Sequence, residues 1–281
     1  VASLGYSMPT LVARWTALRR GGPLIRQFSY LSRDEYDRLP GAPDPISLEH
    51  RILGGKMWLD GSPYTAAMNL SEPYLSSSTA RRLGFAEGAT GHATDDPVRF
   101  FQDFQRLDGQ GFQVAVHCQG DQAAQDLLAA MDRLDDHEGF RSRRHRVEHA
   151  LLPPLALLPR FAAHGATFSF HIDHLYHYGD QLADDILGPA RAAWMLPVRS
   201  AMEAGLRPTL HSDSPMFPHS PMSLLETAVT RRSRSGRTIG ADQSLTVLQG
   251  LRALTLNAAY QVHAEKQLGS IEVGKRADFT W

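Results

Sequence analysis

Four apolar or strand-forming runs of this chain carry a side chain that is able to take part in metal chemistry. Three of the runs close with His117, His149 and Asp213, and Lys56 lies in the fourth, upstream of the others. Enzymes built as parallel (β/α)8 barrels carry their catalytic groups at the carboxyl ends of the strands. The order Lys, His, His, Asp on successive strand ends therefore favours a metal-dependent hydrolase on an α/β barrel.

Strand-like and helix-like segments alternate along the chain, which argues for a parallel sheet covered by helices. Apolar residues recur at helical spacing in 10–20, 97–110, 121–134, 154–164, 191–204, 221–232 and 246–260. Strand patterns fall at 24–31, 56–59, 112–117, 146–149, 166–171 and 207–211. A complete (β/α)8 barrel needs eight strands in about 250 residues. The six strands found here predict that two more would precede Val1.

Composition narrows the classes of partner. The 281 residues carry 29 basic and 30 acidic side chains, a formal net charge of −1, which gives no electrostatic reason to expect nucleic acid or an anionic membrane surface. No apolar run is long enough to span a bilayer. The single cysteine, Cys118, cannot form an intrachain disulfide and suits a reducing compartment. We expect a cytoplasmic protein with a small-molecule substrate, compatible with a homo-oligomer; a targeting segment before Val1 would lie outside this sequence.

His117 and His149 follow strand-like runs. Neutral imidazole is a common ligand of zinc and similar ions, and a hydrogen-bonded core histidine is the alternative for each. Because side chains alternate along a strand, Val147 and His149 would share one face. Glu148 would then point to the other face, toward the helices, and pair with an arginine. His145 is expected to be a solvated loop residue.

His211 and Asp213 have the same parity after a strand-like run, so both can face the barrel axis. An aspartate there could bind a metal and take a proton from the metal's water, whose pKa falls to about 7 on coordination. The same carboxylate would return the proton to a leaving nitrogen. The alternative is an N-cap aspartate before the proline-rich turn 214–218.

Lys56 calls for a different chemistry, because an ammonium group cannot bind a cation. A desolvated, neutral lysine can react with carbon dioxide to give a carbamate, which bridges two metals as a carboxylate does; burial lowers a lysine pKa enough to allow this. The alternative is a lysine that pairs with Asp60 or extends to solvent.

A histidine- and tyrosine-rich loop is predicted after the strand 166–171. His171, His174 and Tyr176 lie in or beside it and would form a polar lip able to hydrogen-bond a substrate carbonyl. The alternative is a polar loop that is rich in histidine by chance. Trp58 and Tyr64 could line an aromatic pocket, although a place in the core is favoured for Trp58.

These strings resemble those of the amidohydrolase superfamily, specifically amidohydrolase family 3, a branch that includes N-substituted formamide deformylase. The matching strings are Lys56…Asp60-Gly61, His117…Gly120-Asp121, Glu148-His149-Ala150, His174…Gly179-Asp180 and His211-Ser212-Asp213-Ser214-Pro215. Residues 253–260 and 269–279 resemble the superfamily's C-terminal signature, where the chain turns back into a small β-sandwich beside the barrel. The resemblance covers nearly the whole chain.

The resemblance implies a (β/α)8 TIM-type barrel whose first strands, and most of the accessory β-sandwich, are missing from this chain. Residues 1–262 would form the partial barrel, and residues 263–281 the start of the C-terminal return. The family's first-strand His-x-His pair has no match here. Either the chain is a piece of a longer polypeptide, or it is a barrel-derived module that has lost its metal site and binds a small molecule or another chain.

The resemblance also implies one or two divalent metal ions, with zinc the expected ion. His117 and His149 would bind one ion and Asp213 the other, and carbamylated Lys56 would bridge them. Metal-bound hydroxide would attack an amide, N-formyl or N-acyl C–N bond other than a peptide bond, with Asp213 as the proton shuttle.

Further roles are implied for the polar residues around this set. His174 or His211 would polarise or position the substrate carbonyl. Asp60, His171 and Tyr176 would contact the substrate. Each role is an expectation that the fold must bring together in space.

Overall fold

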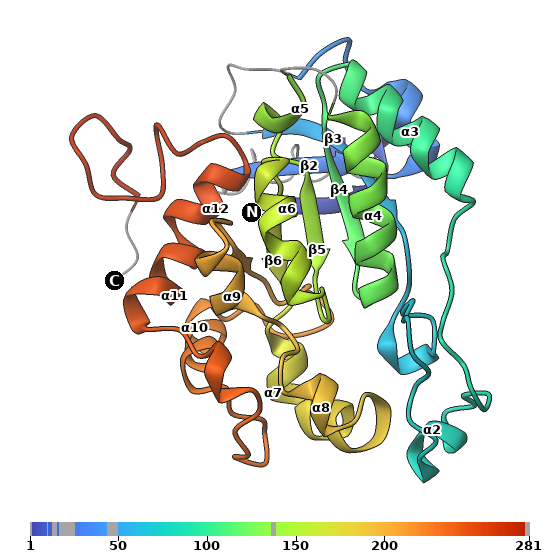
Figure 1. Cartoon of the computed structure of the whole chain (residues 1–281). Coiled ribbons are helices and arrows are strands. Elements are labelled where there is room, and N and C mark those ends of the chain that lie inside the picture. The colour runs from blue at the N-terminus through green and yellow to red at the C-terminus, as the bar shows by residue number, and fades with distance from the viewer. Residues whose placement is uncertain are drawn as a thin grey trace.

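A parallel sheet forms the centre of the fold, and its strands follow one another in sequence order (Figure 1). The computed structural model describes residues 2–9, 11, 12, 16, 26–43, 50–135 and 139–278. Within them the strands are β1 (Ala2–Tyr6), β2 (Gln27–Leu31), β3 (His50–Trp58), β4 (Gln113–Cys118), β5 (Arg146–His149), β6 (Thr167–Phe170) and β7 (Thr209–Leu210). Each strand pairs in parallel with the next, so all their carboxyl ends lie at one end of the sheet.

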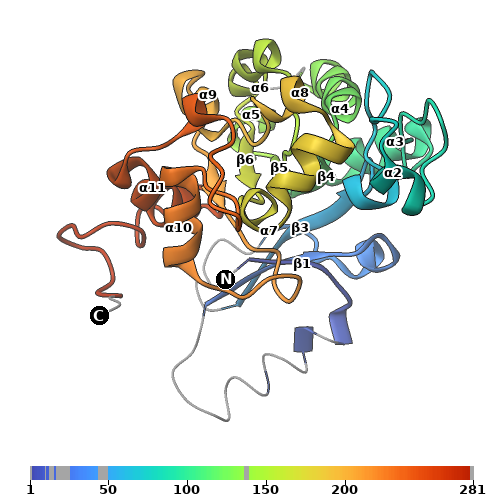
Figure 2. The ribbon, with the colours of Figure 1, turned by 90° about the horizontal axis from the view of Figure 1, so that it is seen from below.

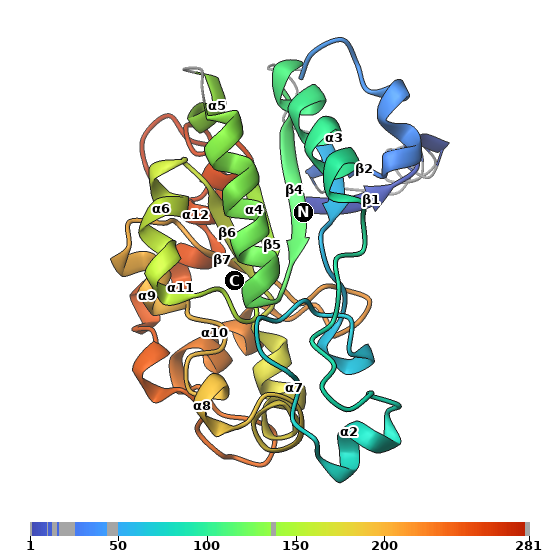
Figure 3. The same ribbon diagram turned by 45° about the vertical axis from the view of Figure 1, so that its right-hand side comes forward.

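Helices connect the strands and cover the sheet. The α-helices are α2 (Ser78–Arg82), α3 (Pro97–Gly109), α4 (Asp121–Leu134), α5 (Gly139–Ser142), α6 (Leu158–Ala163), α7 (Asp173–Gln181), α8 (Pro189–Ala192), α9 (Val198–Glu203), α10 (Pro221–Thr230), α11 (Val247–Leu254) and α12 (Leu256–Gln261). Shorter helical turns are η1 (Arg33–Arg38), η2 (Pro63–Thr65), η3 (Leu155–Leu157), η4 (Leu182–Ile186) and η5 (Ala241–Gln243). Helices α3, α4 and α6 lie along the outer face of the sheet (Figure 3). Helices α7, α8 and α10 gather beyond the carboxyl ends of the strands (Figure 1).

Local sequence signals set several helix boundaries. The predicted helix 121–134 is α4 from end to end, and the predicted helix 97–110 is α3. Asp96 caps α3 by accepting the Arg99 N–H at 2.9 Å. The predicted helix 246–260 begins at a capping box formed by Thr246 and Gln249, but it divides at Thr255 into α11 and α12.

The strand count differs from the predicted six. β1 was not expected, because Ala-Ser-Leu-Gly-Tyr lacks an alternating apolar pattern; its parallel pairing with β2 and the fit of Gly5 against the Trp58 ring hold it in place. Among the described residues β1 and β7 are the edges of a seven-stranded sheet, one strand short of a closed eight-stranded barrel. The predicted helix 10–20 and residues 24 and 25 lie largely outside the described residues.

Two predicted segments take a different form. The segment 191–204 is divided into α8 and α9, because Leu196 has a left-handed backbone (φ 51°) and Pro197 follows it. The histidine-rich segment after β6, predicted as a loop, is helix α7. Leu175, Gly179 and Leu182 are buried one helical turn apart, and this stripe anchors α7 on the core.

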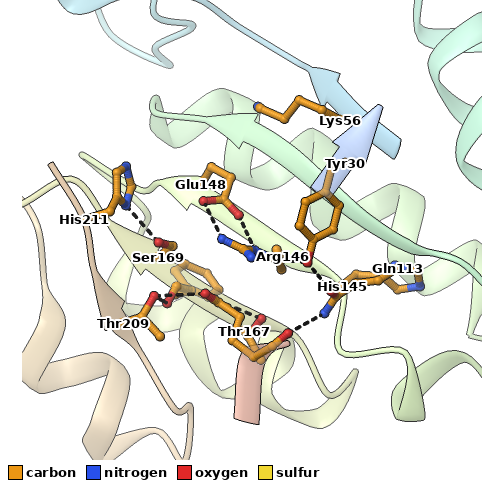
Figure 4. Close-up of polar contacts among 12 residues, drawn as sticks. Tyr30, Lys56, Gln113, His145, Arg146, Glu148, Thr167, Ser169, Thr209 and His211 are labelled. Atoms are coloured by element: carbon orange, nitrogen blue, oxygen red, sulfur yellow. Dashed lines mark hydrogen bonds and ion pairs between the residues drawn. The ribbon is translucent and has the colours of Figure 1, made fainter. Parts of the chain in front are cut away.

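The two faces of the sheet differ in chemistry. One face packs on the outer helices and is apolar; its residues in the main core include Val114, Val116, Val147 and Phe168. The other face carries a buried polar network, seen in Figure 4. Alternation along each strand separates the two sets of side chains.

The polar network crosses several strands. Arg146 on β5 forms a bidentate ion pair with Glu148 at 2.6 and 3.2 Å, and it donates to the Tyr30 hydroxyl on β2 at 3.2 Å. Gln261 of α12 joins the network by accepting from Thr209 on β7 at 3.0 Å. The predicted pairing of Glu148 with an arginine is confirmed. Its predicted orientation toward the helices is wrong, because Glu148 lies on the polar face.

After α12 the described chain runs through turns to Asp278, which pairs with Arg26. The division predicted at residue 262 stays a prediction. None of the described helices is both long and apolar enough to cross a membrane.

Candidate metal centre

Three histidines converge at the carboxyl ends of adjacent strands. His149 ends β5, and His171 and His211 follow β6 and β7 directly. One ligand atom from each ring lies within 4.8 Å of the other two, and they are the one such group of histidine, cysteine and acidic residues found in the described part of the chain. Neighbouring parallel strands place these ends side by side, which explains why residues far apart in sequence meet here.

His149 reaches this group through an irregular backbone. In the strand ladder His149 stands opposite Cys118, whose side chain belongs to the apolar core. The backbone turns left-handed at His149 (φ 72°) and again at Ala150 (φ 48°), so strand alternation no longer decides where the imidazole points. Its ring centroid lies 5.1 Å from that of His211. Non-glycine residues in this region cost of order 1 kcal/mol each, which the surrounding packing must offset.

Hydrogen-bond contacts orient all three rings. His211 contacts the Ser169 hydroxyl through Nδ1 at 2.8 Å and His149 Nδ1 through Nε2 at 3.2 Å. His171 Nε2 lies 3.1 Å from the Ser212 carbonyl oxygen, which can only accept, so this nitrogen carries the proton. The other nitrogen, His171 Nδ1, therefore holds a lone pair, and it is buried without a hydrogen-bond partner.

Burial keeps these imidazoles neutral. It lowers the pKa values of His149, His171 and His211 well below the usual value for histidine. The rings also lower one another's pKa values, because a protonated ring would repel a second positive charge on its neighbour. Neutral rings with free lone pairs are the form that binds a divalent cation. The donor set therefore fits such an ion.

His117 lies beside the group rather than within it. Its ring centroid is 4.3 Å from that of His149, and its Nε2 is 3.6 Å from Oδ1 of Asp60. Burial lowers the pKa of His117 to about 3. Asp60 is fully buried, and its carboxylate accepts backbone N–H groups from Asn69, Gln119 and Gly120 at 3.1, 3.0 and 2.8 Å. Asp60 thus ties together the loops that follow β3 and β4.

Lys56 is buried on β3, 3% exposed, and it contacts none of the three histidines by hydrogen bond. Its Nζ donates to the Met57 carbonyl at 3.0 Å and lies 4.7 Å from the centre of the Trp58 ring. Burial lowers the pKa of Lys56 to about 7. Trp58, expected in the core, is 41% exposed because its ring covers the edge of the sheet at β1.

Asp213 follows β7 in a left-handed backbone conformation (φ 52°), and its side chain is exposed. Its carboxylate does not complete the group formed by the three histidines. Desolvation by the surrounding protein raises the pKa of Asp213 although the residue is exposed, and the nearby Lys56 ammonium acts against that rise. Asp213 therefore stands at the open side of the centre.

His174 sits on α7 behind His171, with ring centroids 3.9 Å apart. Its Nδ1 lies 2.6 Å from the Tyr64 hydroxyl, and its Nε2 is buried without a partner in the described chain. Tyr176, two residues further along α7, is 41% exposed. The predicted polar lip is thus split between a buried histidine and an exposed tyrosine.

Sequence reasoning placed His171 and His211 next to the substrate, whereas the structure groups both with His149. It missed Ser169, which orients His211. The alternation of Thr-Phe-Ser-Phe in β6 could have revealed Ser169 on the polar face. It also placed His145 in solvent. His145 is buried, because its Nε2 meets Asp108 at 3.1 Å and its Nδ1 accepts the Val114 N–H at 3.0 Å.

Comparison with known proteins identifies the family of this chain. The model of the amidohydrolase family matches residues 12–281. The N-substituted formamide deformylase of Arthrobacter pascens is 30% identical over 173 residues, 60% of this chain and 31% of that protein. The protein LONG AFTER FAR-RED 3 of Arabidopsis thaliana is 27% identical over 233 residues, 82% of this chain and 38% of that protein. The chain thus spans about a third of the length of these relatives.

Among solved structures, an uncharacterised metal-dependent hydrolase from Pyrococcus furiosus superposes with a TM-score of 0.81 at 24% sequence identity. The match covers 99% of this chain and 54% of that one. The likeness shows the fold, and the predicted (β/α)8 TIM-type class, present here as an open seven-stranded part, is confirmed.

Proposed function

The chain belongs to the amidohydrolase family, and from that premise we propose that it acts as a metal-dependent hydrolase on a carbon–nitrogen bond of the amide, N-formyl or N-acyl type. The observation that carries the proposal is the group of three neutral histidines with ligand atoms within 4.8 Å of one another. The partial match to a deformylase of N-substituted formamides supports a C–N bond outside peptides.

We assign His149, His171 and His211 as ligands of one divalent ion, zinc being favoured by an all-imidazole donor set. Asp213 remains assigned to a second ion, and Lys56, as a carbamate, would still be shared between the two ions. His117, predicted to share an ion with His149, is proposed instead as a ligand of the second ion, because its ring lies beside the group of three histidines and not within it. A bound divalent ion would supply Lewis-acid chemistry, polarising a carbonyl and lowering the pKa of water.

Side chains of the protein would bind the substrate carbonyl and transfer the proton. The free Nε2 of His174 would donate to the substrate carbonyl oxygen, because Tyr64 occupies the other ring nitrogen. Asp213, exposed at the open side, would take a proton from the attacking water and pass it to the leaving nitrogen. Tyr176 would contact the substrate from the rim. Asp60, predicted to touch the substrate, would act instead through the two loops that it holds.

The test is a hydrolysis screen of the purified, zinc-loaded chain against N-substituted formamides, N-acyl amines and matched esters, read as amine or alcohol released. The proposal expects amine release that falls at least about a hundredfold in His171→Ala, while His92→Ala, an exposed histidine distant from the centre in sequence, retains it. Ester cleavage alone, or equal amine release by both variants, would contradict the proposal.

A further inference from the structure

A cavity of about 250 Å3 lies between helices α7 and α10, which pack side by side (Figure 2). None of the three clustered histidines lines it. Its walls come from α7, from α10 and from the segments flanking α10; the residues are Asp173, Tyr176, His177, Pro218, Ser220, Ser223, Glu226, Thr227, Thr230 and Arg232. Nearly all of these side chains are polar, which is unusual for a space between two packed helices.

Helix α7 presents different faces to the two sites. Asp173, Tyr176 and His177 are spaced three and four residues apart, so they share the face toward the cavity. His174 and Tyr178 share a neighbouring face and both contact Tyr64. The cavity therefore opens on a different face of α7 from the one that carries His174. The two sites are neighbours, because the Phe217 ring centroid lies 5.3 Å from that of His171 and 4.3 Å from that of His177.

Asp173 is the feature that calls for a ligand. Its side chain is only 4% exposed, and it makes no hydrogen bond and no ion pair with any described residue. A carboxylate that faces a cavity with no donor beside it is unfavourable, and proteins pair such groups with donors or cations. The other acidic residue of the lining, Glu226 on α10, is exposed and adds a second negative charge rather than a partner.

The rest of the lining also offers mainly oxygen acceptors. Thr227 is buried at the wall formed by α10. The Ser220 and Ser223 hydroxyls bond each other at 2.9 Å, and Ser220 Oγ also accepts the Ser223 N–H at 3.4 Å, so part of their acceptor capacity remains available. Arg232 is exposed and forms no ion pair with Asp173 or Glu226 among the described residues.

We propose that this cavity binds a small organic cation, an ammonium or guanidinium group, with the Asp173 carboxylate as its main partner. N–H donors to a carboxylate form the charge-assisted bonds that this group lacks. The volume exceeds that of a single water, about 30 Å3, and accommodates an alkylammonium group. The Tyr176 ring in the wall adds a surface that favours a cation. This proposal does not depend on the proposed hydrolase activity, because it concerns only the binding of a cation.

The test uses n-butylammonium chloride, with 1-butanol as its neutral match and potassium chloride as the inorganic alternative. Binding is followed by 1H–15N NMR on chelator-treated protein, so that the amine has no metal to bind. The expected result is saturable binding of the ammonium, with shifts in α7 and α10, that weakens at least about tenfold in Asp173→Asn. Asp180→Asn, also on α7 but bonded to Ser233 and outside the cavity, should bind as the unaltered chain does.

Three results would overturn the proposal: no saturable ammonium binding, equal binding of 1-butanol, or binding of potassium only. Equal affinity in Asp173→Asn would overturn it as well. If Asp173→Asn fails to fold, Glu226→Gln at the exposed wall takes its place, with a several-fold loss of affinity expected and an unchanged affinity contradicting the proposal. None of these readouts depends on turnover, so failure here is distinct from failure of the proposed hydrolase activity.

Discussion

The Tyr64 hydroxyl lies 2.6 Å from Nδ1 of His174, and this contact decides which ring nitrogen of His174 is free. Burial raises the pKa of Tyr64 well above 10, so the hydroxyl keeps its proton. No other acceptor for that proton is found among the described residues. The hydroxyl therefore donates to Nδ1, which leaves the hydrogen of the neutral imidazole on Nε2.

Replacing Tyr64 with Phe removes the donor that holds the His174 proton on Nε2. We expect the 15N NMR signals of His174 to shift from the Nε2–H form toward a mixture, because no donor then holds Nδ1. If His174 donates to a substrate carbonyl, kcat for C–N cleavage should fall about tenfold or more with little change in KM. Tyr178→Phe, whose ring packs on Tyr64 at 4.7 Å, is the matched control. An unchanged His174 tautomer in Tyr64→Phe would contradict the assignment.

The buried ion pair between Arg146 and Glu148 gives a stability prediction. Both side chains are almost fully buried on the polar face of the sheet. Glu148→Gln removes the charge that compensates the Arg146 guanidinium, so it should lower the free energy of unfolding by about 3–5 kcal/mol. Glu203→Gln breaks the exposed pair with Arg199 and should cost less than about 1 kcal/mol. Urea denaturation measures both, and similar losses would refute the burial argument.

His263 gives the stability a pH dependence. It lies partly buried after α12, and its Nε2–H donates to the Arg143 carbonyl at 3.1 Å. Burial lowers its pKa to about 4 from an ordinary value of 6.5. The unfolded chain therefore takes up a proton below pH 6.5 that the folded chain refuses until about pH 4. The contribution of His263 to stability is fully present above pH 6.5 and is lost as pH falls toward 4.

His263→Gln should therefore reduce the loss of unfolding free energy between pH 7 and pH 4 by about 2 kcal/mol. Glutamine can still donate to the Arg143 carbonyl, so stability at pH 7 should change little. His92→Gln, at an exposed site, is the control. Urea melts at several pH values test this, and an unaltered pH slope in His263→Gln would count against it.

Local patterns predicted the elements that depend on local signals. Helix α4, and helix α3 with Pro97 in its first turn, follow from amphipathic spacing and end signals that lie within each segment. The four runs predicted to carry metal-competent residues do end at one end of the sheet. β1 escaped prediction, because pairing with β2 rather than its own composition makes it a strand.

The details of the site could not be predicted, because they depend on contacts between distant segments. Strand parity failed at His149, where a left-handed backbone redirects the ring, and the same error placed Glu148 on the wrong face. The free nitrogen of His171 is set by the Ser212 carbonyl, 41 residues along the chain. The family resemblance named His149, His171 and His211 but assigned only His149 to a metal, and it could not supply the hydrogen bonds of these residues.

The most direct test of the central claim is the metal content of the purified chain, measured by plasma mass spectrometry after zinc loading and dialysis against metal-free buffer. The account predicts at least about one zinc ion per chain, a content that drops at least severalfold in His171→Ala and stays unchanged in His92→Ala. A folded chain that retains no zinc, or a His171→Ala variant that retains as much as the unaltered chain, would contradict the assignment of His149, His171 and His211 as a metal centre.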